Sequence, residues 1–182
     1  MGSHFANKVK KAKIRFKKIM ELKLPEKLIT LQQLQSIVAG LKEQRQKVVW
    51  TNGCFDILHV GHVTYLEQAK ALGDLLIMGL NSDASIKILK GGNRPIFNEI
   101  ERATVLNAIV YVDYITTFDA PSPRKILQQL KPDFYVKGGD YTIDTIDQLE
   151  RRSIESYGGK IIILPIKKGV STTNIIKKIE SL

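Results

Sequence analysis

Two histidines flank a glycine where an apolar strand of this chain gives way to a helix. The segment 51–62 reads TNGCFDILHVGH, with His59 and His62 on either side of Gly61. A helix N-terminus offers unpaired N–H groups and the positive end of the helix dipole, so it stabilises an anion. Two imidazole donors add to this effect, and a glycine lets the backbone approach a ligand closely. The spacing therefore predicts a phosphate-binding site.

A zinc site and a cysteine nucleophile are the alternative interpretations of this segment. The one other histidine is His4 and the one cysteine is Cys54, whereas a structural zinc site usually needs further Cys or His ligands. Cys54 also has no third histidine to activate it elsewhere in the chain. Phosphate binding is therefore preferred over zinc, and Cys54 is expected to be a small, buried residue that leaves a strand.

Length and composition point to one globular domain with a short extension. The chain has 182 residues, of which 43% are hydrophobic and 25% are charged. No run of eighteen apolar residues and no cleavable leader is found, so a cytoplasmic location without a membrane partner is expected. A single cysteine excludes an internal disulfide framework. The opening Met-Gly-Ser-His resembles an expression tag and is left out of the functional argument.

The first 26 residues form a basic extension ahead of a domain expected at 27–182. Residues 1–24 hold eight basic side chains against Glu21 alone, a net +7 of the chain's +10. Such an arm could bind a polyanion by counterion release. A solvated helix is preferred over nucleic-acid binding, because no aromatic residues interleave with the lysines for base stacking. Pro25 then ends the arm, and Thr30 caps a helix to about Lys42.

Beyond Lys47 the chain alternates between strand and helix patterns, which is typical of a parallel α/β sheet. Continuous apolar runs such as 75–80 indicate strands that are covered on both faces. The fold class is therefore predicted as α/β, a Rossmann-like parallel five-stranded sheet with helices on both faces, plus the N-terminal helical extension. The predicted strands are 48–52, 75–80, 112–117, 133–137 and 160–164, and the predicted helices are 62–72, 99–109, 122–130, 144–156 and 172–180.

Polar residues and glycines follow four of the predicted strands. In a parallel sheet the carboxyl ends of the strands share one edge, where ligands gather near the switch in strand order. Ser171 or Thr172 is also placed to cap the last helix, whose free N–H groups would face a phosphate. Simple capping is the alternative, but it would need no second hydroxyl. The strand-end residues are Asn52 and Asp56, Asn81 to Asp83, Lys137 to Tyr141, and Gly169 to Thr173.

With these residues in place, the chain resembles the cytidylyltransferase-like nucleotidyltransferases through HVGH at 59–62 and GVSTT at 169–173. The resemblance covers roughly residues 27–182. More narrowly, TNGCFD at 51–56, NSD at 81–83, the segment 89–95 and VKGGDY at 136–141 resemble the adenylyltransferases that make ADP-heptose. That subgroup joins D-glycero-β-D-manno-heptose 1-phosphate to ATP for lipopolysaccharide assembly, releasing pyrophosphate. Many relatives carry a fused sugar kinase, so this chain resembles the stand-alone form.

The resemblance implies a role for each matched residue. His59, His62 and Lys90 are expected to be catalytic, and Mg²⁺ is expected to accompany ATP, with its protein ligands left open and Asp56 as one carboxylate to consider. Asp83 is expected to orient a loop that carries Lys90. A homodimer is a family expectation. The expected nucleotide-binding residues are Thr51, Asn52, Gly53, Cys54, Phe55, Asp56, Gly61, Gly138, Gly139, Asp140, Ser171, Thr172 and Thr173, and the expected substrate-binding residues are Asn81, Asp83, Arg94, Arg102 and Lys137.

The reaction implied needs no general base, because a sugar phosphate is already ionised near neutral pH. The site must align two anions and neutralise the charge that grows on the transferred phosphoryl group. Arg102 is expected to pair with a phosphate or with a neighbouring acid. Two alternatives stay open, a CTP-dependent cytidylyltransferase for an alcohol phosphate and a polyanion-binding protein. Ile166 stands where cytidylyltransferases commonly carry an arginine, which disfavours CTP despite Lys167 and Lys168.

Overall fold

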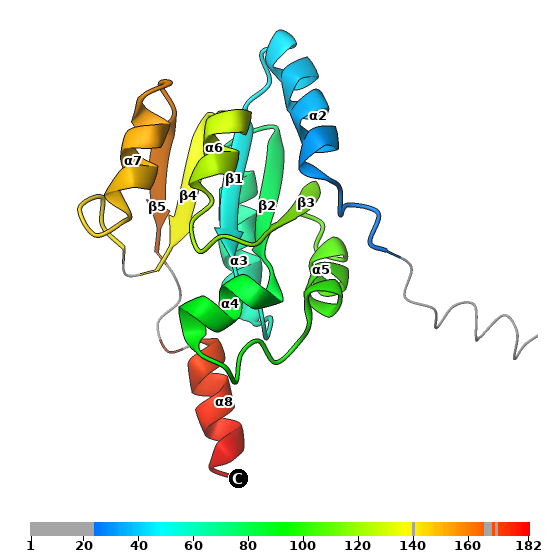
Figure 1. Cartoon of the computed structure of the whole chain (residues 1–182), viewed down its shortest axis with the longest axis vertical. Helices are drawn as coiled ribbons and strands as arrows, with labels where there is room; N and C mark the ends of the chain where they lie inside the picture. The colour runs from blue at the N-terminus through cyan, green and yellow to red at the C-terminus, as the bar shows by residue number, and fades with distance from the viewer. Residues whose placement is uncertain (1–23, 140, 166–168, 170) are drawn as a thin grey trace, which may run out of the picture.

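A five-stranded, all-parallel sheet organises the chain, as the sequence predicts (Figure 1). The structure, a computed structural model, describes residues 24–139, 141–165, 169 and 171–182. The strand order is β3-β2-β1-β4-β5, so the order reverses between β1 and β4, where α/β sheets bind their ligands. The strands are β1 (Val48–Gly53), β2 (Leu75–Asn81), β3 (Tyr114–Phe118), β4 (Phe134–Gly138) and β5 (Lys160–Leu164).

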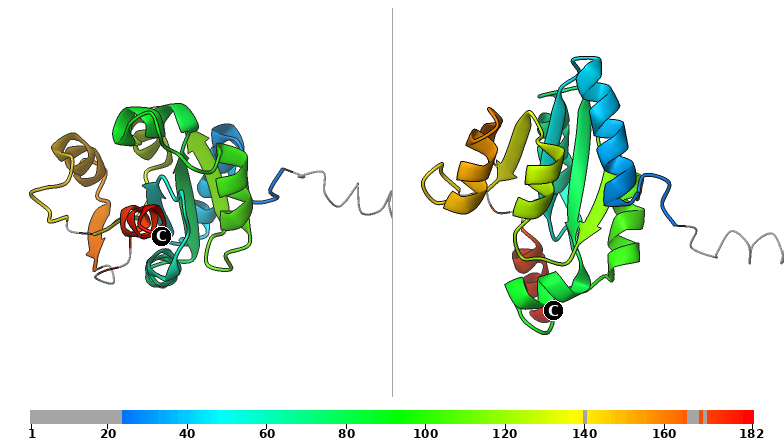
Figure 2. Two further views of the ribbon diagram at one scale, coloured as in Figure 1. Left: turned by 90° about the horizontal axis from the view of Figure 1, so that it is seen from below. Right: turned by 45° about the horizontal axis from the view of Figure 1, so that its top comes forward.

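Helices cover both faces of the sheet, as Figure 2 shows from below. One apolar cluster joins α3 and α5 to a face of the sheet through residues such as Val49 and Leu66. The other joins α2, α6 and α7 to the opposite face around Trp50 and Tyr135. The helices are α2 (Leu31–Glu43), α3 (Val60–Lys70), α4 (Asp83–Lys90), α5 (Glu99–Asn107), α6 (Arg124–Leu130), α7 (Gln148–Glu155) and α8 (Thr172–Glu180).

Two differences from the predicted elements have clear physical causes. The segment after β2 was expected to be a loop, but Ser82 accepts a hydrogen bond from the Ser85 amide and starts the two-turn helix α4. Lys90 therefore ends a helix. The third strand begins at Tyr114 rather than at residue 112, because Asp113 instead accepts hydrogen bonds from the Leu76 amide and from Lys70 Nζ.

Other local signals behave as predicted. Thr30 caps α2, and Gln33 completes a capping box by accepting a hydrogen bond from the Thr30 amide. The Lys27 amide donates to Asn107 Oδ1, and Leu28 forms a β-bridge with Ile115. These contacts attach the chain to the sheet from residue 27, where the domain was expected to begin. The domain boundary itself stays a prediction, because the basic arm at 1–23 lies outside the described residues.

Candidate active site

A cavity of about 450 Å³ opens at the carboxyl ends of β1 and β4. This volume is typical of small-molecule sites. In Figure 1, α4 and α8 lie beyond these strand ends, and their termini complete the wall. The described lining is made of the two histidines, three basic side chains, one carboxylate, hydroxyls, glycines and apolar groups: Asn52, Gly53, Cys54, Phe55, Asp56, His59, Gly61, His62, Tyr65, Asn81, Leu89, Lys90, Arg94, Pro121, Lys137, Gly138, Tyr141, Ser171, Thr172 and Thr173.

The two histidines stack on each other at the start of α3. Their ring centroids are 3.8 Å apart, and the ring centroid of Phe55 lies 4.9 Å from that of His62. His59 occupies the N-cap position without capping through its side chain, so the Val60 and Gly61 amides stay uncapped, while the His62 amide donates to the His59 carbonyl. Neither Nδ1 atom has a hydrogen-bond partner among the described residues, although both are buried. Both rings line the cavity, and neither is committed to another described residue through Nδ1.

Both histidines are neutral near pH 7. Burial, with a smaller contribution from the charge of His59, lowers the pKa of His62 to about 4. Burial also lowers the pKa of His59. A neutral imidazole still donates one hydrogen bond, but it carries no full charge. The cationic groups of the cavity are therefore its lysines and arginine.

Asp56 fixes the loop that closes one side of the cavity. Its carboxylate is buried and accepts hydrogen bonds from Arg94 Nε at 2.6 Å, the Ile96 amide at 2.9 Å and the Phe97 amide at 3.0 Å. Burial alone would raise its pKa, but these amides and the Arg94 guanidinium hold the pKa below its ordinary value. Asp56 is therefore an anionic anchor for Arg94, and its oxygens are already engaged.

Arg102 is a buried anchor outside the cavity wall. Its guanidinium donates to Asp83 Oδ1 at 2.7 Å, to the Cys54 carbonyl at 2.7 Å and to the Phe97 carbonyl at 3.0 Å. Of the two partners expected for Arg102, the structure shows the neighbouring acid. Asp83 opens α4, whose last residue is Lys90, so this ion pair joins α4 to the segment after β1. Asp83 thus orients a helix that carries Lys90.

Lys137 and Asn52 enter the cavity from the ends of β4 and β1. Tyr135 and Glu150 together connect these two residues. The Tyr135 hydroxyl lies 3.1 Å from Asn52 Oδ1 and also contacts the buried carboxylate of Glu150 on α7. Glu150 accepts a hydrogen bond from Ser122 and lies 3.4 Å from Lys137 Nζ. The Lys137 ammonium also lies 5.0 Å from the centroid of the Tyr135 ring, close enough for a cation–π contact.

Gly138 leaves room for the buried ring of Tyr65. A Cβ at this position would lie 2.7 Å from that ring. The Tyr65 hydroxyl donates to the Val136 carbonyl and lies 2.6 Å from Thr51 Oγ1, so Thr51 supports the ring from beneath the cavity wall. Thr51 is fully buried and does not line the cavity.

The start of α8 brings three hydroxyl side chains to the cavity. Ser171 is the N-cap and accepts a hydrogen bond from the Asn174 amide, while Thr172 donates to the Ile57 carbonyl across the cavity rim. The second hydroxyl thus has a use beyond capping, since it ties α8 to the segment that precedes His59. Thr173 also lines the wall. Asp140, residues 166–168 and Val170 lie outside the described residues.

Among its described residues, this cavity offers neither a reactive cysteine nor a cluster of metal ligands. Burial raises the pKa of the Cys54 thiol, although Lys90 and Arg102 oppose the shift, so the thiolate is disfavoured. No three His, Cys, Asp or Glu side chains gather into a metal site within the described ranges. In the same part of the chain, no helix is long and apolar enough to cross a membrane.

Sequence reasoning missed several residues that shape the site. Tyr65 lies one turn after His62 and reads as a core residue of α3. Glu150 lies thirteen residues after Lys137, on α7 rather than on β4. No local sequence pattern therefore links Glu150 to the end of β4. Leu89 and Pro121 also line the cavity without a signal in the sequence.

Together, the fold and the site define a Rossmann-like α/β protein whose cavity is lined by lysines, an arginine and a His-x-Gly-His helix start. The family model for cytidylyltransferase-like proteins matches residues 50–178. The chain belongs to the cytidylyltransferase-like family.

Relatives and solved structures agree with this placement. The bifunctional protein HldE of Geobacter sulfurreducens is 50% identical over 153 residues, covering 84% of this chain and 31% of that protein. HldE of Syntrophotalea carbinolica is 46% identical over 158 residues, covering 87% and 32%. The chain thus spans about a third of the length of these relatives.

Two solved structures share the fold. The lipopolysaccharide core biosynthesis protein of Thermoplasma volcanium is 31% identical, with a TM-score of 0.55, covering 69% of this chain and 99% of that one. Pantoate-β-alanine ligase of Francisella tularensis, solved with a β-γ ATP compound and β-alanine, has a TM-score of 0.57 at 17% identity, covering 85% of this chain and 78% of that one. The latter likeness shows the fold alone.

Proposed function

We propose that this chain is an adenylyltransferase that transfers AMP from ATP to D-glycero-β-D-manno-heptose 1-phosphate, giving ADP-heptose and pyrophosphate. Membership of the cytidylyltransferase-like family supports nucleotidyl transfer. The motifs shared with ADP-heptose-forming enzymes support the acceptor. The likeness to HldE proteins and to a lipopolysaccharide core biosynthesis protein is consistent with it.

The observation that carries the proposal is the balance of charge in the cavity. Lys90, Arg94 and Lys137 line it together with the two neutral histidines, and Asp56 is the one carboxylate in the described lining. The Asp56 oxygens are engaged by Arg94 and two backbone amides. Such a lining would attract anions, and no carboxylate among its described residues is free to act as a base. It suits a nucleophile that arrives already ionised.

In the proposed reaction, an oxygen of the sugar phosphate attacks the α-phosphorus of ATP. A new oxygen–phosphorus bond forms while the bond from the α-phosphorus to the bridging oxygen breaks, and the electron pair leaves with pyrophosphate. No proton has to move. His59 and His62 would donate hydrogen bonds to the α-phosphoryl oxygens, and Lys90 would neutralise the growing charge. Arg94 and Lys137 would hold the flanking phosphates, with Arg94 oriented by Asp56.

We propose magnesium only as an ion that the nucleotide carries. Mg²⁺ usually keeps waters and substrate phosphates as ligands and takes few from the protein. The one carboxylate of the described lining, Asp56, is engaged on both oxygens, so it does not fit a direct ligand role. When bound with ATP, the ion would withdraw charge from the phosphates. The expected homodimer and cytoplasmic location stay predictions.

The experiment that tests this function measures pyrophosphate release by the purified chain with Mg²⁺. ATP and CTP are each combined with heptose 1-phosphate and glycerol 3-phosphate. We expect turnover with ATP and heptose 1-phosphate, and a loss of about 100-fold or more in His62→Ala, the usual cost of one preorganised donor. Lys178→Ala, an exposed change on α8, is the matched control and should keep full activity.

The outcomes separate the alternatives. Turnover with CTP and glycerol 3-phosphate alone would assign a cytidylyltransferase on the same fold. Turnover that survives in His62→Ala would remove the histidine from the mechanism. Silence in every combination, from a protein that still melts cooperatively, would overturn the proposal.

A further inference from the structure

His62 lines the candidate active site without a hydrogen bond that would hold its ring. Its Nδ1 atom is buried and has no partner among the described residues. A working histidine is usually oriented by a hydrogen bond at its second ring nitrogen. Two aromatic rings lie against His62, that of His59 with a centroid distance of 3.8 Å and that of Phe55 with 4.9 Å. The orientation of His62 therefore depends on ring packing.

Phe55 is the more firmly held of these two neighbours. Its side chain is 7% exposed and belongs to the apolar cluster that joins α3 and α5 to the sheet. Gly53 leaves room for the ring, since a Cβ there would lie 2.9 Å from it. The His59 side chain, by contrast, makes no cap hydrogen bond, and its Nδ1 lacks a partner among the described residues. Phe55 is thus the fixed surface against which His62 packs.

The backbone at Phe55 is left-handed, with φ 44°. Residues with a side chain seldom adopt this conformation, because Cβ then crowds the carbonyl oxygen. The other described examples, Arg45 and Lys131, follow the last turns of α2 and α6, where a left-handed residue is common. Phe55 ends no helix, and a glycine would fit its backbone at a lower cost. A costly conformation that carries a ring against His62 indicates a use for that ring.

Contacts on both sides hold Phe55 in this conformation. The carbonyl of Cys54, the residue before it, accepts a hydrogen bond from Arg102 at 2.7 Å. The carboxylate of Asp56, the residue after it, accepts one from Arg94 at 2.6 Å. Both arginines come from elements that follow β2, so tertiary contacts fix the segment 54–56. The position of the Phe55 ring is therefore set before a ligand binds.

The surroundings of His62 agree with a role for apolar packing. Burial lowers the pKa of His62 to about 4, and the charge of His59 makes a smaller contribution. An apolar ring beside the imidazole keeps water away, which disfavours its charged form. No described hydrogen bond or ion pair joins His62 to the charged side chains of the cavity lining, which are Asp56, Lys90, Arg94 and Lys137.

We propose that Phe55 is the positioning residue of His62, and that its ring, held by the clamped segment 54–56, fixes the imidazole in the orientation that faces the ligand. The inference rests on the proposed function, in which His62 donates to the α-phosphoryl oxygens. Phe55 acts through His62 and does not itself bind the nucleotide. A donor that is already oriented needs no rearrangement in the transition state, which is where its hydrogen bond accelerates the reaction.

The test removes the ring but keeps an apolar side chain. Phe55→Leu lacks the aromatic plane and, because leucine is not β-branched, bears a similar backbone cost. Phe55→Met is a second variant, whose adaptable side chain fills irregular space. It takes the place of the leucine variant if that protein does not melt cooperatively.

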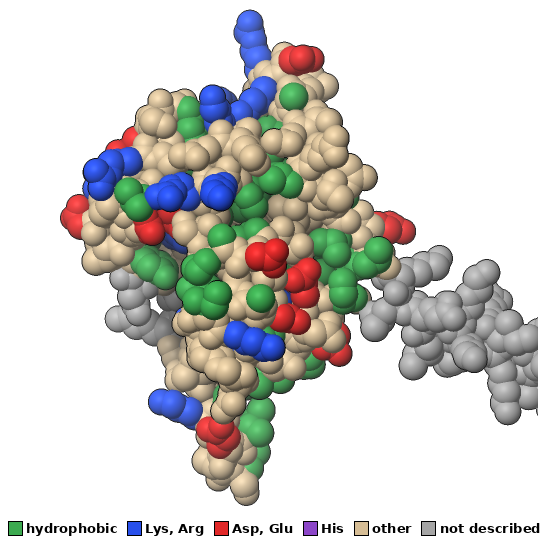
Figure 3. Space-filling view, in the orientation of Figure 1, with side chains coloured by type: hydrophobic (Ala, Val, Ile, Leu, Met, Phe, Trp, Pro, Cys, Tyr) green, Lys and Arg blue, Asp and Glu red, His purple; other side chains and the backbone are tan. Residues whose placement is uncertain are grey.

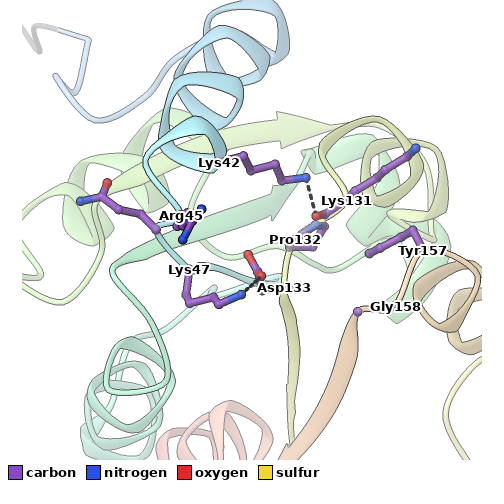
Figure 4. A pocket seen from close by; sticks show the side chains of 10 residues that line it. Lys42, Arg45, Lys47, Lys131, Pro132, Asp133, Tyr157 and Gly158 are labelled. Atoms are coloured by element: carbon purple, nitrogen blue, oxygen red, sulfur yellow. Dashed lines mark hydrogen bonds and ion pairs between the residues drawn. The ribbon is translucent and has the colours of Figure 1, made fainter.

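The matched control is Phe134→Leu, the same change at the opposite edge of the sheet. Phe134 opens β4 and packs against the same apolar cluster as Phe55. It directly follows Asp133, whose ion pair with Lys47 is drawn in Figure 4. Many of the visible Lys and Arg side chains gather toward this end of the molecule (Figure 3). The control therefore loses packing in the same cluster, away from the histidines.

The first measurement is an NMR titration of the His62 ring in the full chain, with His62→Asn to assign its signals. We expect the pKa of His62 to rise by about one unit in Phe55→Leu and to stay unchanged in Phe134→Leu. An unchanged titration in a folded Phe55 variant would overturn the proposal, as would an equal shift in the control. This measurement needs no turnover, so it decides the inference separately from the proposed function.

The second measurement is steady-state kinetics with ATP and heptose 1-phosphate. We expect kcat to fall about tenfold in Phe55→Leu while the KM for ATP changes by less than about twofold. Phe134→Leu should keep the kcat of the wild type. A raised KM with an unchanged kcat would show that the ring contacts the nucleotide itself, which would refute a positioning role.

Discussion

The Tyr135 hydroxyl lies 2.5 Å from Oε2 of Glu150, a carboxylate buried beneath the candidate active site. Burial and this carboxylate hold the pKa of Tyr135 well above its ordinary value, so the hydroxyl stays protonated and donates to Glu150. The same hydroxyl contacts Asn52, and Glu150 pairs with Lys137. A helix on one face of the sheet thereby positions two side chains that line the cavity.

Replacing Glu150 with glutamine should weaken both stability and nucleotide binding. Lys137 would lose its carboxylate and Tyr135 its charged acceptor, at a cost of about 1–3 kcal/mol in the free energy of unfolding. The KM for ATP should rise about tenfold, which steady-state kinetics can measure beside urea unfolding. Glu155→Gln, an exposed residue of the same helix, is the control and should change stability by less than about 1 kcal/mol. An unchanged KM in the Glu150 variant would show that the network is structural only.

Replacing Arg102 with lysine should destabilise the fold while keeping the charge. A lysine cannot reach the Asp83 carboxylate and the carbonyls of Cys54 and Phe97 at the same time. We therefore expect the free energy of unfolding to fall by about 2–3 kcal/mol, measured by denaturant unfolding. The turnover rate should fall as well, because α4 and the segment after β1 lose their common anchor. Asp83→Asn keeps an acceptor and should cost less. A raised KM with unchanged stability would instead indicate that Arg102 binds a phosphate directly.

His62 should make the folded state sensitive to mild acid. Its pKa is lowered from 6.5 to about 4, so between these values the unfolded chain binds a proton that the folded chain does not. His62 therefore does not change the free energy of unfolding above about pH 7. As the pH falls from 6.5 to 4, this group lowers the free energy of unfolding by about 3 kcal/mol. Unfolding curves measured across this range should converge between the wild type and His62→Asn as the pH falls. Parallel pH profiles would contradict the assignment.

A methyl group at Gly138 should disturb the floor of the cavity. The added Cβ would lie 2.7 Å from the Tyr65 ring, which is itself fixed by Val136 and Thr51. We expect Gly138→Ala to lower the free energy of unfolding by about 1–3 kcal/mol. The companion variant Gly40→Ala, where the new Cβ meets nothing within 4 Å on α2, should be neutral or stabilising. If Gly138→Ala were equally harmless, the close approach would not constrain this position.

Local patterns predicted much of the fold. Apolar runs located β1, β2 and β5 within a residue of their observed ends, since a buried parallel strand leaves a continuous hydrophobic signature. The short helix α4 escaped prediction because two turns seldom establish a clear period, and its Ser82 cap reads equally well as a turn. For Arg102, the sequence predicted either a phosphate or a neighbouring acid as its partner, and it could not choose between them.

The sequence by itself determined the strand-to-helix alternation, the His-x-Gly-His helix start and the edge of the sheet where ligand-binding groups gather. These follow from hydrophobic periodicity and from the fact that parallel strands share one carboxyl edge. Tertiary structure alone decided that Asp56 pairs with Arg94, that Glu150 lies beside Lys137, and that Arg102 pairs with Asp83. These relations join residues from different elements, and hydrogen-bond and charge partners depend on distances that packing sets.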